Sequence, residues 1–250
     1  MNPAVPLSGK CVLVTGAARR IGAAIVQAMH AAGANVVIHH RGSAAEAAAL
    51  GAALNEQRPR SALTVHAELT DLKALPQLVE RARSAFGRLD VLVNNASSFY
   101  PTRVGQITPQ QWDDLIGSNL RAPLFLSQLA APELKRNHGL IINLIDIHAL
   151  RPLRHHTVYS VAKAGLATLT RSLARELAPE VRVNGIAPGP VLWPDADIEP
   201  EVKQEIMERT ALKRMGTPED VARAAIFFAQ DAPYVTGQIL AVDGGRSVGW

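Results

Sequence analysis

Short apolar runs that alternate with longer segments of helical period constrain this chain more than any other feature of its sequence. The runs are rich in Val, Ile and Leu and show no polar alternation, which is typical of strands buried on both faces of a parallel sheet. We expect strands at residues 11–15, 35–40, 63–66, 91–94, 140–144, 181–186 and 239–242. We expect helices between them at residues 20–32, 44–55, 72–86, 111–135, 158–177, 201–209 and 219–229.

The sequence therefore predicts an α/β fold, a single-domain doubly wound (Rossmann) sheet of seven mainly parallel strands with helices on both faces. The length of 250 residues suits one domain of this class, spanning residues 1–250. Ligands of such sheets bind at the carboxyl ends of the strands. Residues 187–200 form a long irregular stretch dense in Pro and Asp, and we predict a substrate loop at about residues 190–212.

Composition and charge argue against several other classes of protein. Hydrophobic residues make up 48% of the chain and charged residues 19%, which indicates a large core rather than disorder. The net charge of +4 comes from scattered basic residues, so we predict no nucleic-acid partner. The longest stretch without formal charge, residues 21–40, is too polar to span a bilayer, and residues 1–10 do not resemble a signal peptide. The single cysteine, Cys11, suits a reducing compartment, so we predict a cytoplasmic protein with no metal site.

The turn after the first strand has the pattern of a phosphate-binding loop. Gly16 and Gly22 flank it, and the next helix begins inside it, so that the helix N-terminus is directed toward a phosphate. Arg19 and Arg20 add positive charge beside Ile21, where a pyrophosphate would lie. We predict nucleotide binding here, against the alternative of a merely structural turn.

The end of the second strand indicates which cofactor is bound. An Asp or Glu there would accept hydrogen bonds from a free ribose 2′-hydroxyl, but this chain carries His40, Arg41 and Ser43 instead. A guanidinium and a hydroxyl suit a 2′-phosphate. The sequence therefore predicts NADPH, with a solvated basic turn as the alternative.

Asn94-Asn95-Ala96 and Tyr159-x-x-x-Lys163 resemble motifs of the short-chain dehydrogenase/reductase family. The resemblance covers essentially the whole chain, because further matching positions follow in order. They are Asp71, Asn119, Asn184, Pro188 and Gly189. It implies that the cofactor contacts Asp71, Asn95, Ala96, Ser97, Tyr159, Lys163, Pro188 and Gly189 in addition to the residues of the two turns.

Proton transfer to or from a substrate explains why a tyrosine and a lysine occur in this motif. A spacing of four places Tyr159 and Lys163 on one helix face, where an ammonium favours proton release from the phenol. The resemblance implies that Tyr159 exchanges a proton opposite the hydride, that Lys163 holds the nicotinamide ribose, and that Asn119 supports a proton-relaying water.

Three departures from the general family pattern resemble the pteridine reductase branch. Arg20 replaces the middle glycine of the turn, Ser97 replaces the glycine after Asn-Asn-Ala, and Asp146 replaces the serine thirteen residues before the tyrosine. A carboxylate cannot donate a hydrogen bond to a ketone as a serine does, but it can share protons with Tyr159 or with a ring nitrogen. Asp146 should also oppose Lys163 and keep the phenol protonated, which suits reduction.

The pteridine resemblance also implies a substrate site. Phe99 would stack the flat pterin against the nicotinamide, and Arg20 and Ser97 would bind its polar edge. Asp146 and Tyr159 would bind its ring, while Leu192 and Trp193 would lie in the closing loop. The alternatives are a core anchor for Phe99, a small turn residue for Ser97 and a surface anchor for Trp193.

The leading hypothesis is an NADPH-dependent pteridine reductase acting on an oxidised pterin or a dihydropterin, with dihydrofolate and dihydromonapterin as further candidates. The rival hypothesis is a carbonyl reductase such as a 3-ketoacyl-carrier-protein reductase. Asp146 argues against it, because the general family pattern has a serine at this position. A non-enzymatic NADP(H) sensor or assembly subunit is the third reading. The resemblance further implies a homotetramer, in which Trp250 would reach a neighbouring active site.

Overall fold

The computed structural model describes residues 7–192 and 199–248. In this part of the chain the strands form one seven-stranded sheet with the order β3-β2-β1-β4-β5-β6-β7. Every neighbouring pair is parallel, so the predicted doubly wound α/β fold is confirmed and the sheet is wholly rather than mainly parallel. The strands are β1 (Cys11–Val14), β2 (Asn35–His40), β3 (Ala62–His66), β4 (Val91–Asn94), β5 (Leu140–Leu144), β6 (Arg182–Pro188) and β7 (Ile239–Val242).

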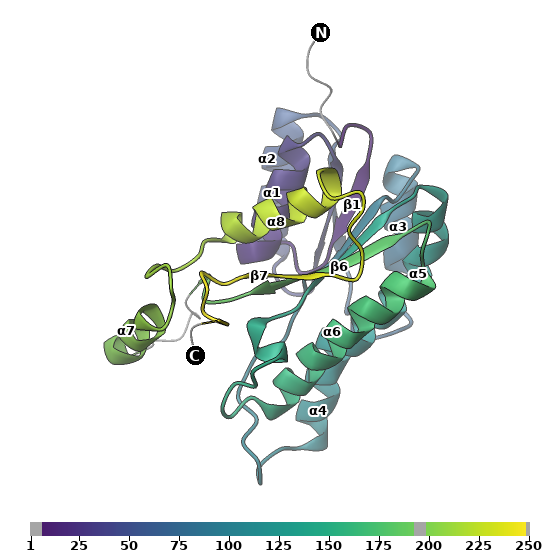
Figure 1. The fold of residues 1–250 in the computed structure, drawn as a ribbon. Helices are drawn as coiled ribbons and strands as arrows, with labels where there is room; N and C mark the ends of the chain where they lie inside the picture. The colour runs from purple at the N-terminus through teal and green to yellow at the C-terminus, as the bar shows by residue number, and fades with distance from the viewer. Residues whose placement is uncertain (1–6, 193–198, 249–250) are drawn as a thin grey trace.

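Helices cover both faces of this sheet (Figure 1). One face is covered by α1 (Arg20–Ala31), α2 (Ala44–Gln57) and α8 (Pro218–Gln230). The other face is covered by α3 (Leu75–Phe86), α5 (Ala122–Arg136) and α6 (Thr157–Glu176). α4 (Pro109–Ile116) precedes α5 and packs against α6.

The alternation of side chains along the buried strands builds the two apolar layers. In β1, Val12 and Val14 pack on the α1 side, whereas Cys11 and Leu13 pack on the α3 side. All four side chains are fully buried, because successive residues of a strand point to opposite faces and both faces are covered. Their burial explains why the sequence shows continuous apolar runs.

The helix predicted at residues 111–135 is interrupted, and that prediction is wrong in one respect. A π-helical turn, Gly117–Arg121, separates α4 from α5 and contains Asn119. Such turns often occur at functional sites, because the extra residue redirects side chains. The start of α4 is well marked in the sequence, since Thr108 and Gln111 form a capping box.

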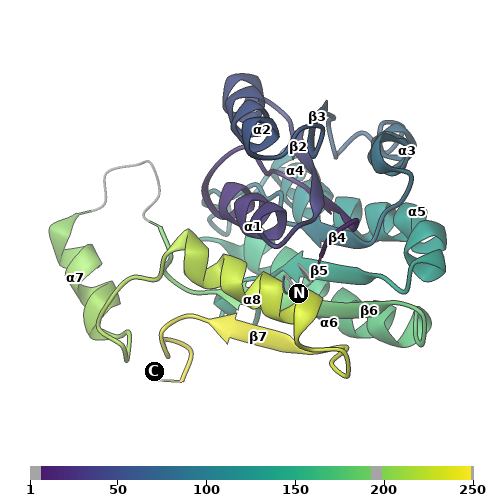
Figure 2. The same ribbon diagram turned by 90° about the horizontal axis from the view of Figure 1, so that it is seen from above.

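The predicted substrate loop at residues 190–212 contains a helix, α7 (Pro200–Glu208). No residue of α7 is buried, and both views place it apart from the body of the sheet (Figures 1 and 2). The predicted lid residue Trp193 and the terminal Trp250 lie outside the described residues.

Candidate active site

The turn after β1 is shaped by two glycines. Gly16 has φ +60°, and a Cβ there would lie 2.9 Å from Ala96 Cα. A Cβ at Gly22 would lie 2.4 Å from the Gly16 carbonyl oxygen and 2.6 Å from Asn95 Nδ2. Arg20 also adopts a positive φ, +55°, which explains why the general pattern has glycine at this position.

His39 fixes this turn from the neighbouring strand, and the sequence analysis did not single it out. The Gly16 amide donates to His39 Nδ1 at 3.0 Å, and Nε2 lies 3.1 Å from the Ala67 carbonyl oxygen. The ring is therefore neutral and protonated on Nε2, because Nδ1 must accept. Burial lowers the pKa of His39 to about 4, which keeps the ring in this form at neutral pH.

A cleft of about 700 Å³ runs along the carboxyl ends of β1, β2 and β3. Most of the residues predicted to bind the cofactor line it. They are Gly16, Arg19, Arg20, Ile21, Gly22, His40, Arg41, Ser43, Asn95, Ala96 and Ser97.

Asp71 does not line this cleft and lies instead in a separate hollow of about 280 Å³ beside α3. Its carboxylate accepts the Lys73 amide at 3.0 Å. Glu68 and Leu69 occupy the corresponding edge of the cleft, because they directly follow the carboxyl end of β3. Glu68 and Leu69, rather than the predicted Asp71, therefore line this edge of the cleft.

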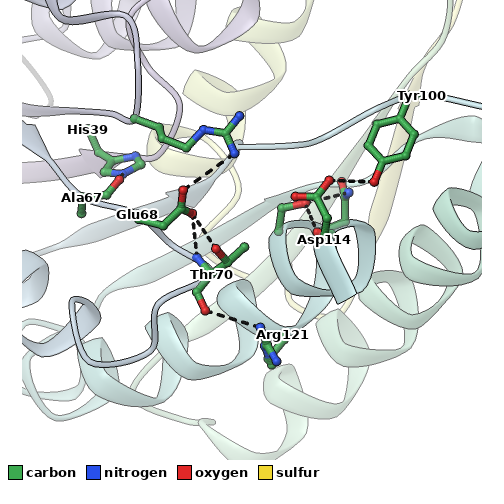
Figure 3. A network of polar contacts seen from close by, with 10 residues as sticks. His39, Ala67, Glu68, Thr70, Tyr100, Asp114 and Arg121 are labelled. Carbon is green, nitrogen blue, oxygen red and sulfur yellow. Dashed lines mark hydrogen bonds and ion pairs between the residues drawn. The ribbon is translucent and has the colours of Figure 1, made fainter. Parts of the chain in front are cut away.

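Glu68 links the cleft to the π-helical turn (Figure 3). One carboxylate oxygen lies 3.8 Å from an Arg41 guanidinium nitrogen, and the other accepts the amide and the hydroxyl of Thr70. Arg121 in turn donates to the Thr70 carbonyl oxygen at 3.4 Å. Although burial opposes it, the bonds from Thr70 and the charge of Arg41 lower the pKa of Glu68, so it is ionised at neutral pH.

A second hollow, of about 260 Å³, lies at the carboxyl ends of β5 and β6. Arg20, Ile21, Asn95 and Ser97 line both this hollow and the cleft, so the two spaces are contiguous. The predicted residues that line only the hollow are Asp146, Tyr159, Lys163, Pro188, Gly189 and Leu192.

Tyr159 and Asp146 form the central contact of this hollow. The phenol hydroxyl donates to Asp146 Oδ2 at 2.8 Å, and Asp146 Oδ1 accepts the His148 amide at 2.8 Å. Burial, the charge of Asp146 and this hydrogen bond raise the pKa of Tyr159 well above its usual value. The phenol is therefore protonated at neutral pH, and the effect expected from Lys163 does not determine the direction of the shift.

Lys163 lies one helical turn further along α6. Its Nζ donates to the Leu144 carbonyl oxygen at 2.8 Å and lies 5.6 Å from the centroid of the Tyr159 ring. Burial lowers its pKa to about 8, and the nearby Asp146 opposes that change. A lysine with such a pKa exchanges its proton readily near neutral pH, which suits a relay.

Asn119 does not line the hollow but supports its wall. Its Oδ1 accepts from the Ser97 hydroxyl at 2.6 Å, and its Nδ2 donates to the carbonyl oxygens of Ser98 and Leu115. The side chain is fully buried. Asn119 thus fixes the segment that follows β4.

Phe99 does not line the hollow but contacts Tyr159, which does. Phe99 is 48% exposed, which argues against the alternative of a core anchor. Its ring meets Tyr159 edge-on with centroids 4.8 Å apart and stacks on His156 at 4.6 Å. The next residue, Tyr100, donates to Asp114 of α4 at 2.9 Å and so anchors the segment (Figure 3).

Among residues 7–192 and 199–248, no three His, Cys, Asp or Glu side chains are grouped so that they could hold a metal ion. No helix in these ranges combines the length and the apolar character needed to cross a membrane.

The chain is similar in sequence to known reductases. Residues 16–247 match a family model described as enoyl-(acyl carrier protein) reductase. The chain is 38% identical to pteridine reductase 1 of Leishmania tarentolae over an alignment of 288 positions, which covers 99% of this chain and 98% of that protein. It is 35% identical over 240 residues to a 3-oxoacyl-(acyl-carrier-protein) reductase of Staphylococcus aureus, covering 94% of this chain and 97% of that protein.

Proposed function

This chain belongs to the short-chain dehydrogenase/reductase family, and we propose that within it the protein is an NADPH-dependent pteridine reductase. It is an oxidoreductase, and its proposed reaction is hydride transfer to a C=N bond of an oxidised pterin or a dihydropterin, including dihydrofolate or dihydromonapterin. Residues 1–250 would form one NADP(H)-binding domain. The observation that carries the proposal is the 2.8 Å hydrogen bond from Tyr159 to Asp146.

Three features of the cleft fit a nicotinamide dinucleotide with a 2′-phosphate. Gly16 and Gly22 allow a tight turn that would not accommodate a Cβ, and this turn directs the N-terminus of α1 toward the place of a pyrophosphate. No acidic residue ends β2, where Arg41 and Ser43 follow instead. His40 Nδ1 is buried and has no hydrogen-bond partner among the described residues, so a bound group can satisfy it.

The bound cofactor would supply the hydride, and the chain's own residues would manage the proton. Tyr159 would donate its phenol proton to the ring nitrogen while the neighbouring ring carbon receives the hydride. Lys163 would return a proton to the phenolate, since its lowered pKa of about 8 makes it a ready donor. Phe99, partly exposed beside Tyr159, would stack on the flat ring and shield it from water.

Asp146 is the residue that favours a pterin over a ketone. The carboxylate already accepts two hydrogen bonds, from Tyr159 and from the His148 amide. An ionised carboxylate has no proton to donate to a carbonyl oxygen, whereas it can accept from the N–H and amino groups of a pterin. Arg20, Ser97 and Leu192 would complete the substrate site beside it.

The second candidate function is reduction of a 3-oxoacyl thioester. The relative from Staphylococcus aureus favours it, because its 35% identity is close to the 38% of the pteridine reductase. A non-enzymatic NADP(H) sensor is the remaining alternative, and any turnover excludes it.

We further propose a cytoplasmic homotetramer. The single, buried Cys11 suits a reducing compartment. Large apolar side chains are exposed at Trp112 of α4, Val161 of α6, Phe227 of α8 and Leu240 of β7. Exposed apolar side chains on several elements suit burial between subunits.

Oxidation of NADPH tests the function directly, with dihydrobiopterin, biopterin, dihydrofolate and a 3-oxoacyl thioester assayed in parallel. We expect turnover of a pterin and little or none of the thioester. Turnover of the thioester alone would contradict the proposal and leave an ordinary carbonyl reductase.

A further inference from the structure

A third hollow, of about 450 Å³, opens beside the N-terminus of α6. We call it the outer hollow. It is formed by two loops, and its lining residues are Arg103, Val104, Gln106, Arg154, His155 and Thr157.

The outer hollow is cationic. Arg103 and Arg154 are exposed, and no acidic side chain in the described part of the chain lines the hollow or forms an ion pair with either arginine. Partial desolvation and the charges of Arg103 and Arg154 lower the pKa of His155, so the two guanidinium groups act on the same small space. Arg19 and Arg41, by contrast, each lie close to a glutamate carboxylate.

Hydrogen bonds hold the two loops together under this charge. The Thr102 amide donates to the His155 carbonyl oxygen at 2.5 Å, and the Thr102 hydroxyl accepts the Val158 amide at 3.2 Å. His155 adopts a φ of +65° to make this connection. Like charges are therefore kept close in a fixed arrangement, which costs free energy unless an anion offsets it.

The outer hollow adjoins the active site through Phe99. The Phe99 ring contacts Tyr159 on one side and stacks on His156 on the other, and His156 directly follows the hollow residue His155. A substrate whose flat ring lies between Asp146 and Phe99 would therefore extend past His156 toward Arg103 and Arg154.

We propose that the outer hollow binds the carboxylates of a tail carried by the substrate. This inference rests on the proposed function and specifies its substrate class: a pterin with an anionic tail, such as the aminobenzoyl-glutamate of a folate, rather than a pterin with a short neutral one. Two guanidinium groups match the carboxylates of a terminal glutamate in charge and geometry.

The test compares dihydrofolate with dihydrobiopterin, which shares its pterin ring but carries a short neutral side chain. We expect a lower KM for dihydrofolate in the wild-type protein. The double substitution Arg103→Gln and Arg154→Gln should raise that KM about three- to tenfold, which is the scale of two exposed charge pairs, and should leave the KM for dihydrobiopterin unchanged. Arg81→Gln, an exposed arginine of α3, is the matched control and should change neither KM.

Each outcome decides the inference. Equal KM values for the two substrates in the wild-type protein, or a KM for dihydrofolate that the double substitution leaves unchanged, would overturn the carboxylate site while the proposed function stands. Failure to reduce any pterin would overturn the proposed function and this inference with it. Retained turnover of dihydrobiopterin shows that the double variant is folded.

Discussion

The two ends of the site are built on different principles. At the nucleotide end, after β1 to β3, the shape comes from backbone and from Gly16 and Gly22, and the charges are carried by exposed side chains such as Arg41, which is 62% exposed. At the chemical end, after β4 and β5, the side chains of Asn119, Tyr159 and Lys163 are buried. They form hydrogen bonds with Ser97, Asp146 and the Leu144 carbonyl oxygen, respectively.

This difference predicts how each end responds to substitution. When one member of a buried polar network is removed, the hydrogen bond is lost and the remaining partner stays buried with neither a hydrogen bond nor water. An exposed charge is already screened by water and contributes less. Substitutions at the chemical end should therefore have large effects on turnover, and those of exposed charges at the nucleotide end should have small, graded effects.

Tyr159→Phe should have the largest effect. Loss of the only proposed proton donor should lower kcat about 10² to 10⁴-fold, while NADPH binding, followed by fluorescence, stays within a few-fold of wild type. Tyr234→Phe is the matched control, because Tyr234 is fully exposed, and it should have wild-type kcat. A Tyr159→Phe variant with kcat near that of wild type would remove the phenol from the mechanism.

His39 is a deeply buried residue of the nucleotide end and should make stability depend on pH. Its pKa falls from 6.5 in the unfolded chain to about 4 in the fold, so the unfolded state binds more protons between these values. The contribution of His39 to the free energy of unfolding should be complete above pH 6.5. It should decrease by up to about 3 kcal/mol as the pH falls toward 4. Urea unfolding at several pH values measures it.

Two variants separate His39 from the other histidines. His39→Asn should flatten the pH dependence, although it lowers stability at pH 7 by removing the bond to Gly16. His138→Asn, at an exposed position, should leave the pH dependence as in wild type. An equally steep profile in His39→Asn would show that the slope arises elsewhere.

Gly22→Ala tests the backbone design of the turn. The new Cβ would overlap the Gly16 carbonyl oxygen, so the turn must move, and NADPH should bind at least about tenfold more weakly. Gly42→Ala is the control, because Gly42 also lines the cleft but a Cβ there meets nothing within 4 Å. Equal Kd values for the two variants would contradict this account of the turn.

Arg41→Gln should have the smallest effect. Arg41 is exposed and already shares its charge with Glu68, so we expect NADPH to bind only about three- to tenfold more weakly, with NADH binding unchanged. Parallel Kd measurements with the two cofactors test this. An equal loss for both cofactors would mean that Arg41 does not act on the 2′-phosphate.

Much of the fold follows from local sequence, because the continuous apolar runs can be buried only in a covered parallel sheet. The strand predicted from residue 35 begins there, whereas the helix predicted from residue 111 begins at Pro109, directly after the capping residue Thr108. The π-helical turn around Asn119 is not visible in the sequence, since an extra residue in a helix depends on packing with Thr70 and α6 rather than on local propensity.

A sequence motif names Tyr159 and Lys163, and the structure places both at one hollow. No motif marks the edge of the cleft, where the path of the chain after β3 brings Glu68 and Leu69, whereas Asp71 lies at another hollow. For His39 a signal existed: adjacent residues of a strand face opposite sides, so one of the two histidines that end β2 must face the glycine turn.

The measurement that tests the central claim most directly is the ratio of kcat/KM for dihydrobiopterin to that for a 3-oxoacyl thioester, in wild type and in Asp146→Ser. Since the account assigns pterin recognition to the carboxylate bonded to Tyr159, it predicts a wild-type ratio far above one and a fall of at least about a hundredfold in the variant. A wild-type ratio below one, or a ratio unchanged by the substitution, would contradict it.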